Sequence, residues 1–217
     1  MAPRKTEQQL PDYYECVARD VIDMCEPSEG VWVDLGSGAG PVAFALAEHS
    51  GSTLVLVDPD RDALSDALFE AAERGLQHRT VAVVGSAEAL PLADACADLV
   101  VSRGSIFFWQ DQAEGVRQVH RALRPGGKAM LGGGLGRTYP LWARQEFIRR
   151  RRQSVRKRGP RAVRAFNQVR SRGAFRRWAE EAGLQRFELV GEAALAEDDP
   201  DTGLGMWLIF EKERQQT

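Results

Sequence analysis

Three alternate glycines follow a short apolar run that ends beside a carboxylate. The run is Val31–Leu35, it contains Asp34, and the glycines are Gly36, Gly38 and Gly40. Glycine allows positive φ and lets a ligand lie close to the main chain. Pro41 begins the next apolar run, at a position where a helix does not need its N–H. Because a helix start offers free N–H groups, these residues predict a strand, a turn and a helix around a nucleotide-type ligand.

A second carboxylate, Asp58, follows the apolar run Thr53–Val57 and is followed by Pro59. A carboxylate at the end of a second strand can accept hydrogen bonds from both hydroxyls of a ribose. The segment Gly38–Ala43 also satisfies the dinucleotide-binding pattern G-x-G-x-x-A. The glycines alone therefore leave a nicotinamide-dependent oxidoreductase open.

Further β-type runs continue the alternation with helical segments. They are Thr80–Val84, Leu99–Ser102 and Lys128–Leu131, with Phe187–Val190 and Met206–Phe210 near the end. This order predicts βαβ units and a doubly wound α/β fold with a seven-stranded, mostly parallel sheet. Right-handed crossovers would place every strand-to-helix loop at one edge of the sheet, where such folds bind ligands.

Taken together, these stretches closely resemble the class I S-adenosylmethionine-dependent methyltransferases, in particular those that act on small molecules. The similarity is strong over residues 30–134 and loose elsewhere. It implies a Rossmann-like methyltransferase fold with an antiparallel hairpin formed by the last two strands. It also implies S-adenosylmethionine as methyl donor, S-adenosylhomocysteine as product, and in-line transfer to a small-molecule acceptor.

The resemblance assigns roles to the residues that follow the strands. Asp34 would hold the amino group of the cofactor, and Asp58 its ribose hydroxyls. Ser86 and Ala87 would meet the adenine, although the commoner pattern has an acid at the position of Ser86. The full set of expected cofactor-binding residues is Asp34, Gly36, Ser37, Gly38, Gly40, Asp58, Pro59, Ser86, Ala87, Glu88, Ser102 and Arg103.

In this class, groups near the reaction follow the fourth strand. Arg103 is a candidate to pair with a carboxylate of cofactor or substrate, with an ordinary surface arginine as the alternative. The expected acceptor contacts are Tyr14, Ser105, Phe108 and Trp109. Aromatic faces there would attract a sulfonium, although core packing explains such residues equally well. No general base is assigned, and the Asn/Asp-Pro-Pro-aromatic motif of amino-methylating nucleic-acid enzymes is absent.

The charge is unevenly distributed. Residues 144–177 hold fourteen Lys or Arg and one acid, Glu146, whereas the whole chain has a net charge of −2. One interpretation is a helical lid that favours an anionic small substrate. A second is an RNA methyltransferase that binds phosphates through this segment, and a third is simply solvated helices. A non-catalytic S-adenosylmethionine-binding protein also stays open.

At 217 residues we expect one domain with four parts. Residues 1–29 would form an N-terminal helical cap, with a helix from Pro11 to Cys25, and residues 30–134 the cofactor-binding core. Residues 135–170 would form the basic lid, and residues 171–217 the last helix and hairpin, joined through the acidic stretch 197–201.

Two further features set expectations about location and metal binding. No apolar run reaches the ~20 residues that span a bilayer, and residues 1–9 are polar, so we expect a cytoplasmic protein. The three cysteines have no C-x-x-C spacing, so we expect no metal site. The sequence leaves the acceptor and the oligomeric state open.

Overall fold

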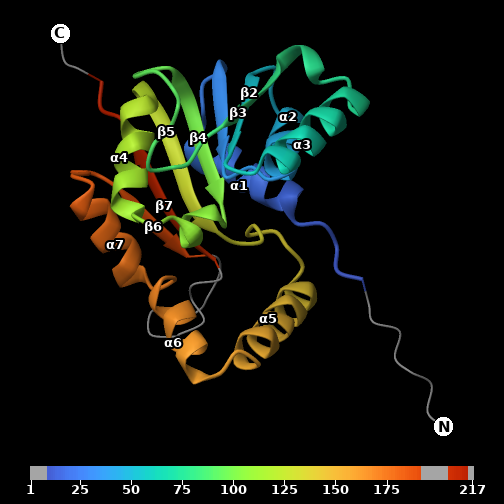
Figure 1. The fold of residues 1–217 in the computed structure, drawn as a ribbon, viewed down its shortest axis with the longest axis vertical. Coiled ribbons are helices and arrows are strands. Elements are labelled where there is room, and N and C mark those ends of the chain that lie inside the picture. The colour runs from blue at the N-terminus through green and yellow to red at the C-terminus, as the bar shows by residue number, and fades with distance from the viewer. Residues whose placement is uncertain (1–8, 192–204, 215–217) are drawn as a thin grey trace.

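A seven-stranded sheet forms the centre of the computed structural model, which describes residues 9–191 and 205–214 (Figure 1). The strand order is β3-β2-β1-β4-β5-β7-β6, and β7 runs antiparallel to both of its neighbours while β1 to β5 are parallel. The predicted fold class is therefore confirmed. The strands are β1 Val31–Leu35, β2 Thr53–Asp58, β3 Thr80–Val84, β4 Ala97–Arg103, β5 Leu123–Gly133, β6 Glu188–Gly191 and β7 Met206–Glu211.

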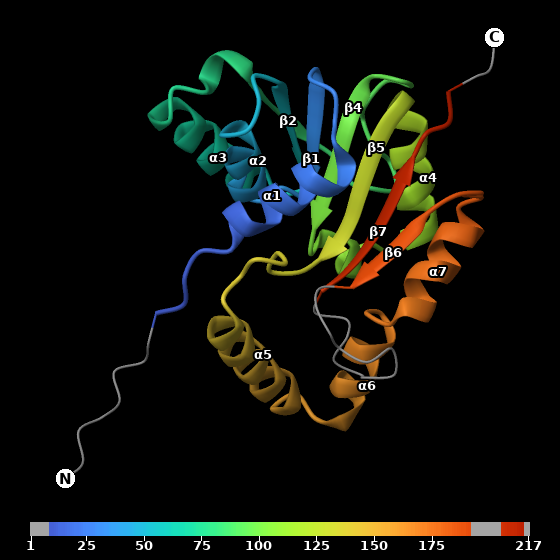
Figure 2. The same ribbon diagram turned by 180° about the vertical axis from the view of Figure 1, so that it is seen from behind.

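Helices cover both faces of this sheet (Figures 1 and 2). One face carries α1 (Tyr14–Cys25), α2 (Pro41–Ala47) and α3 (Arg61–Glu73), and the other carries α4 (Gln112–Ala122) and α7 (Arg172–Glu181). Successive strand residues point to opposite faces. Leu99 and Met130 accordingly pack toward α1 and α2, whereas their neighbours Val100 and Leu131 pack toward α4 and α7. Burial on both faces explains the continuous apolar runs in the sequence.

Local sequence signals fix most of the element boundaries. The Asp60 carboxylate caps α3 by accepting hydrogen bonds from the N–H groups of Asp62 and Ala63, and the Ser171 hydroxyl caps α7 in the same way. Two predicted boundaries were wrong by three residues or more, and others by one or two. The first helix begins at Tyr14 rather than Pro11, and β5 begins at Leu123 rather than Lys128, because Leu123 already pairs with Ala97.

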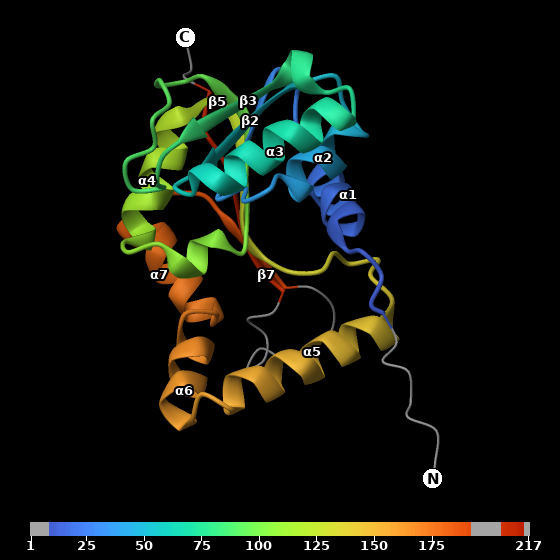
Figure 3. The same cartoon turned by 45° about the vertical axis from the view of Figure 1, so that its right-hand side comes forward.

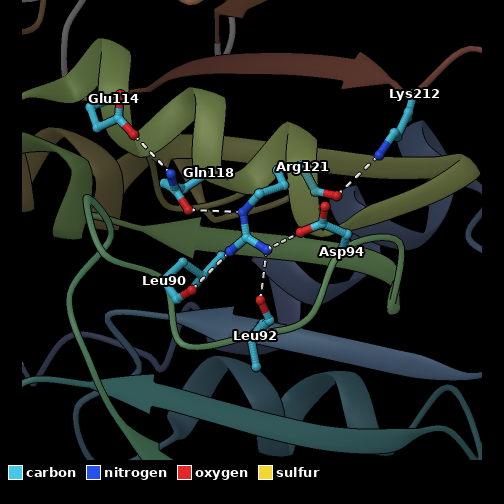
Figure 4. Close-up of polar contacts among 7 residues, drawn as sticks. All are labelled: Leu90, Leu92, Asp94, Glu114, Gln118, Arg121 and Lys212. Atoms are coloured by element: carbon cyan, nitrogen blue, oxygen red, sulfur yellow. Dashed lines mark hydrogen bonds and ion pairs between the residues drawn. The ribbon is translucent and has the colours of Figure 1, made fainter.

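The connection from β3 to β4 contains no helix, because residues 85–96 form a loop. The short helix η1 (Gln77–Arg79) comes directly before β3. Arg121 of α4 holds this loop (Figure 4). Its guanidinium donates to the carbonyls of Leu90 and Leu92 at 2.9 and 2.7 Å, and to the Asp94 carboxylate at 2.5 Å. Because these carbonyls need partners, Arg121 fixes the loop that contains Ser86 and Glu88.

Two helices, α5 (Leu141–Arg156) and α6 (Pro160–Gln168), lie beyond the carboxyl ends of the parallel strands (Figure 3). The segment that leads into α5 is fastened to α1. Arg137 donates from its backbone N–H and its Nε to the buried Asp20 carboxylate at 2.7 and 3.0 Å. The Tyr139 hydroxyl donates to the Pro11 carbonyl at 2.9 Å. The predicted acidic connection 197–201 lies outside the described residues.

Candidate functional site

A cavity of about 790 Å³ opens at the carboxyl ends of the central strands. Its walls come from the glycine loop after β1, from Asp58, and from the residues after β4 and β5, with the tyrosines of α1 on one side. Phe147 and Arg151 of α5 and Arg170 line the opposite wall. A smaller cavity of about 380 Å³ adjoins it and shares Gly36, Asp58, Ser105 and Phe108 with the larger one.

The three glycines of the loop after β1 have different surroundings: two are packed against side chains, and the third faces open space. Gly36 and Gly40 have φ of +72° and +80°, and a Cβ on Gly36 would lie 2.1 Å from the Ser105 Cβ. A Cβ on Gly40 would meet the Phe44 ring at 2.9 Å. Gly38 also has positive φ, at +53°, but a Cβ there meets no protein atom within 4 Å. Gly38 therefore presents bare backbone to the larger cavity.

Two carboxylates flank that backbone. Asp58 accepts a hydrogen bond from the Gly38 N–H at 2.8 Å through Oδ2 and one from the Asp60 N–H at 2.9 Å through Oδ1. Asp34 is 3% exposed, and its Oδ2 accepts from the Ala43 N–H at 3.2 Å. Burial raises the pKa of Asp34 to about 7, the Asp58 charge adds to this rise, and the Ala43 hydrogen bond opposes it. A bound cation would favour the ionised form of Asp34.

Ser105 lies where β1, β4 and the short helix η2 (Ser105–Phe108) meet. Its hydroxyl donates to the Leu35 carbonyl at 2.8 Å, accepts from Trp109 Nε1 at 3.2 Å, and lies 2.5 Å from the Ser102 hydroxyl. These contacts occupy the Ser105 hydroxyl in holding the walls together. Ser102 is fully buried and lines neither cavity. Trp109, expected at the acceptor, lines only the smaller cavity and packs against Gly115.

Arg103 joins the end of β4 to α1. Its Nε donates to the Gly134 carbonyl at 3.0 Å, and its guanidinium lies 4.2 Å from the Tyr13 ring centroid and 5.7 Å from that of Tyr14. Burial, with the neighbouring Tyr13 hydroxyl, raises the pKa of Tyr14 to about 12. The Tyr14 phenol is therefore protonated at neutral pH and can donate a hydrogen bond into the larger cavity.

The smaller cavity is walled by Pro59, Ser86, Ala87 and Glu88. Glu88 Oε1 accepts from the N–H groups of Gln110 and Asp111 at 2.6 and 3.3 Å. This carboxylate ties the loop after β3 to the start of α4, so hydrogen bonds from backbone N–H groups to a side chain join two distant segments in this wall.

Most of the residues predicted from the sequence reach one of these two cavities. Asp34, Ser37, Gly38, Arg103 and Tyr14 line the larger one, and Gly36, Asp58, Ser105 and Phe108 line both. Gly40 and Ser102 line neither, because Gly40 shapes the turn and Ser102 is buried below it. Tyr13 and Phe107, which adjoin the predicted Tyr14 and Phe108, also line the larger cavity. Lining residues that the sequence did not single out include Leu135, Phe147, Arg151 and Arg170.

The two arginines among these residues had no local signal. Arg151 and Arg170 belong to a run of fourteen bases in which spacing does not distinguish one arginine from another. In the described part of the chain, no three His, Cys, Asp or Glu side chains gather so that they could hold a metal ion. Among the same residues, no helix is both long and apolar enough to cross a membrane.

The two cavities together suit a ligand with three kinds of group. The smaller cavity offers the apolar side chains of Pro59, Ala87 and Phe108 to an apolar ring. Hydroxyls can donate to Asp58, and a cationic group can approach Asp34 along the bare backbone at Gly38. Neutral or ionised carboxylates accept such hydrogen bonds, and an ionised one strengthens them.

Comparison with known proteins identifies relatives of this chain. Residues 33–131 match the methyltransferase domain family. The chain is 33% identical over 117 residues to a chloroplastic 2-methyl-6-phytyl-1,4-hydroquinone methyltransferase of Spinacia oleracea, covering 54% of this chain and 32% of that protein. It is 37% identical over 113 residues to an uncharacterised methyltransferase of Mycobacterium tuberculosis, covering 52% and 43%. The chain thus matches less than half the length of these curated relatives.

Solved structures extend the similarity over nearly the whole chain. A putative S-adenosyl-L-methionine-dependent methyltransferase of Methanococcus maripaludis superposes with a TM-score of 0.75 at 28% identity, covering 94% of this chain and 87% of that one. A geranyl diphosphate C-methyltransferase of Streptomyces coelicolor, solved with S-adenosyl-L-homocysteine, gives 0.61 at 12% identity, covering 91% and 78%. The second likeness concerns the fold alone.

Proposed function

We propose that the chain is a class I S-adenosylmethionine-dependent methyltransferase and that it methylates a small organic acceptor. The match of residues 33–131 to the methyltransferase domain family and the similarity to the Methanococcus maripaludis structure support this proposal. The observation that carries the proposal is the pair of joined cavities, with bare backbone at Gly38 between the carboxylates of Asp34 and Asp58. S-Adenosylmethionine has an adenine, two ribose hydroxyls and a cationic amino-acid end, and these are the groups that this arrangement suits.

The proposed cofactor site follows from that match. Ser86, Ala87 and Glu88 would surround the adenine, and Asp58 would accept from the ribose hydroxyls while still holding the Gly38 N–H. Asp34 would face the ammonium group. Among the described residues its carboxylate accepts one hydrogen bond, from the Ala43 N–H, so it has further capacity to accept hydrogen bonds from that group. Gly40 and Ser102 would support the site from behind.

When bound, S-adenosylmethionine supplies an electrophilic methyl group on a sulfonium. The chain's own contribution would be to hold an acceptor in line with that methyl and to exclude water. Tyr13, Phe107 and Phe108 offer aromatic faces to the larger cavity, and such faces attract a cation. Tyr14 would donate a hydrogen bond to the acceptor. The proposal needs no general base.

Residues 135–170 would act as the lid of the acceptor site. Two observations support this role. The segment that leads into α5 is fastened to α1 through Arg137 and Asp20, and Phe147 and Arg151 of α5 line the larger cavity. The arginines of the lid favour an anionic acceptor. A cytoplasmic location remains our prediction.

RNA as acceptor is the second candidate. A groove of about 880 Å³ on α5 is lined by basic residues, among them Arg149, Arg152 and Lys157, and basic grooves bind phosphate backbones. Unlike Phe147 and Arg151, these residues do not line the larger cavity.

The test is turnover. Purified protein is incubated with S-adenosylmethionine and either a small-molecule extract or total RNA, and S-adenosylhomocysteine is measured by mass spectrometry. We expect product with the extract and none with RNA. Product with RNA alone would overturn the choice of acceptor, and tight cofactor binding without any product would indicate a non-catalytic binding protein.

A further inference from the structure

Arg170 is a buried cation in the wall of the larger cavity. It lies between the end of α6 at Gln168 and the cap of α7 at Ser171, and only 7% of it is exposed. Burying a charge is costly unless the charge is paired or otherwise compensated. The surroundings of Arg170 therefore show what compensates it.

Two aromatic rings hold the guanidinium. Its central carbon lies 3.9 Å from the ring centroids of both Phe107 and Phe166. Its hydrogen bonding is poor by comparison: one Nη1 contact to the Phe166 carbonyl at 3.4 Å, and no carboxylate partner among residues 9–191 and 205–214. Arginine has five N–H donors. The rings satisfy the faces of the guanidinium and leave most of its N–H edge without an acceptor from the described part of the protein.

A second cation lines the same cavity. Arg151 of α5 has its guanidinium 5.4 Å from the Phe166 ring, on the opposite wall from the carboxylates of Asp34 and Asp58. Its helix neighbours Arg149 and Arg150 both pair with Glu146; for Arg151 the described residues provide no such acid. The pKa of Arg170 falls to about 10, mainly through burial and further through the nearby Arg151 charge. The two cations repel each other, and an anion bound between them would replace this repulsion with attraction to both.

We propose that Arg170 and Arg151 form an anion-binding subsite for a carboxylate, sulfonate or phosphate group on the methyl acceptor. This inference rests on the proposed function. Phe107 and Phe147 line the cavity beside the two arginines, so the acceptor class is an amphipathic anion, with an apolar or aromatic body and one acidic end. A neutral lipid would leave both cations without a partner.

The anion bound by the two arginines could also come from the cofactor, because S-adenosylmethionine itself carries a carboxylate. The two sources are separated by asking which ligand loses affinity when a charge is removed. Arg170→Gln and Arg151→Gln each remove one charge. Arg161→Gln, at an exposed arginine of α6 that lines neither cavity, is the matched control for net charge.

The first arm measures an amphipathic anion directly. The probe is 1-anilinonaphthalene-8-sulfonate, followed by fluorescence with and without saturating S-adenosylhomocysteine, and N-phenyl-1-naphthylamine is its uncharged counterpart. We expect the anion to bind at least about tenfold more weakly to Arg170→Gln and Arg151→Gln, with Arg161→Gln and the uncharged probe unaffected. An equal loss in Arg161→Gln, or no loss in either cavity variant, would overturn the subsite. Because Arg151 is exposed, its variant gives a result even where Arg170→Gln fails to fold.

The second arm identifies the source of the anion. Calorimetry compares S-adenosylhomocysteine with 5′-methylthioadenosine, which lacks the carboxylate. We expect both affinities to be unchanged in the two variants. A loss for S-adenosylhomocysteine alone would assign the arginines to the cofactor and contradict our inference. Failure of the wild-type protein to bind either nucleoside would refute the proposed function instead, and the probe measured without cofactor would still report on the subsite.

Discussion

The two walls of the larger cavity are built in opposite ways. On the sheet side, Asp34 and Asp58 accept hydrogen bonds from backbone N–H groups of neighbouring segments, and Ser105 donates one to a backbone carbonyl. On the lid side, Arg151 and Arg170 contact aromatic rings and have no acid partner in the described chain. A wall fixed by its own backbone suits a constant ligand, such as the cofactor. A wall of cations without counter-charges suits a variable one, the acceptor.

The largest effect should come from the sheet side, at Gly36. Gly36→Ala places a Cβ 2.1 Å from Ser105 at φ +72°, so we expect it to lower the free energy of unfolding by about 3 kcal/mol or more. Gly38→Ala meets no protein atom and should cost about 1–2 kcal/mol through its backbone conformation. Thermal denaturation measures both, with Gly173→Ala in α7 as control. Equal losses at Gly36 and Gly38 would contradict the packing difference.

Asp58→Ala should weaken cofactor binding by about 1–3 kcal/mol, because it leaves the Gly38 N–H and the ribose hydroxyls without an acceptor. Calorimetry with S-adenosylhomocysteine measures this loss. The matched variant is Asp62→Ala, an exposed acid in the first turn of α3. Equal affinities for the two variants would remove Asp58 from the site.

Asp34 predicts a pH dependence of binding. With a pKa of about 7 in the free protein, the carboxyl must ionise to face the ammonium group. The affinity for S-adenosylhomocysteine should therefore fall about tenfold per pH unit below 7 and level off above it. Asp34→Asn should flatten the profile. A wild-type affinity that is constant between pH 5.5 and 8.5 would show that Asp34 does not face the cation.

The same group also affects stability without cofactor. Because its folded pKa lies above the ordinary value of 3.8, the native state binds more protons than the unfolded state between these values. The Asp34 contribution to the unfolding free energy thus falls as pH rises from about 4 through 7. Asp34→Asn should be more stable than wild type at pH 8, by about 1–3 kcal/mol. Chemical denaturation at pH 5 and 8 provides the comparison, and a less stable variant at pH 8 would refute the sign.

The smallest effect should come from the paired arginines of the lid. Glu146 is held by Arg149 and Arg150, whose hydrogen bonds lower its pKa to about 2. Exposed ion pairs of this kind contribute little. Glu146→Gln should leave the melting temperature, the affinity for S-adenosylhomocysteine and the sulfonate-probe affinity unchanged. A changed probe affinity would mean that the paired arginines, too, belong to the acceptor wall.

The contrast between the walls also explains what could be predicted from the sequence. Asp34, Asp58 and Gly36 lie at or directly after the carboxyl ends of apolar strands, so the topology rule for parallel sheets brings them together. Arg170 obtains its position from Phe107, more than sixty residues earlier, and from the angle between α6 and α7. Trp109 was expected beside the acceptor, but the hydrogen bond to Ser105 turns it toward the smaller cavity. Tertiary contacts of this kind leave no periodic signal in the chain.

The most direct test is a calorimetric titration of the wild-type protein with S-adenosylhomocysteine and, separately, with NADH. We predict that one equivalent of S-adenosylhomocysteine binds, that Asp58→Ala weakens this binding, and that NADH gives no heat of binding. Uptake of NADH with no uptake of S-adenosylhomocysteine would contradict the assignment of the cavities between β1 and β4 to a methyl donor.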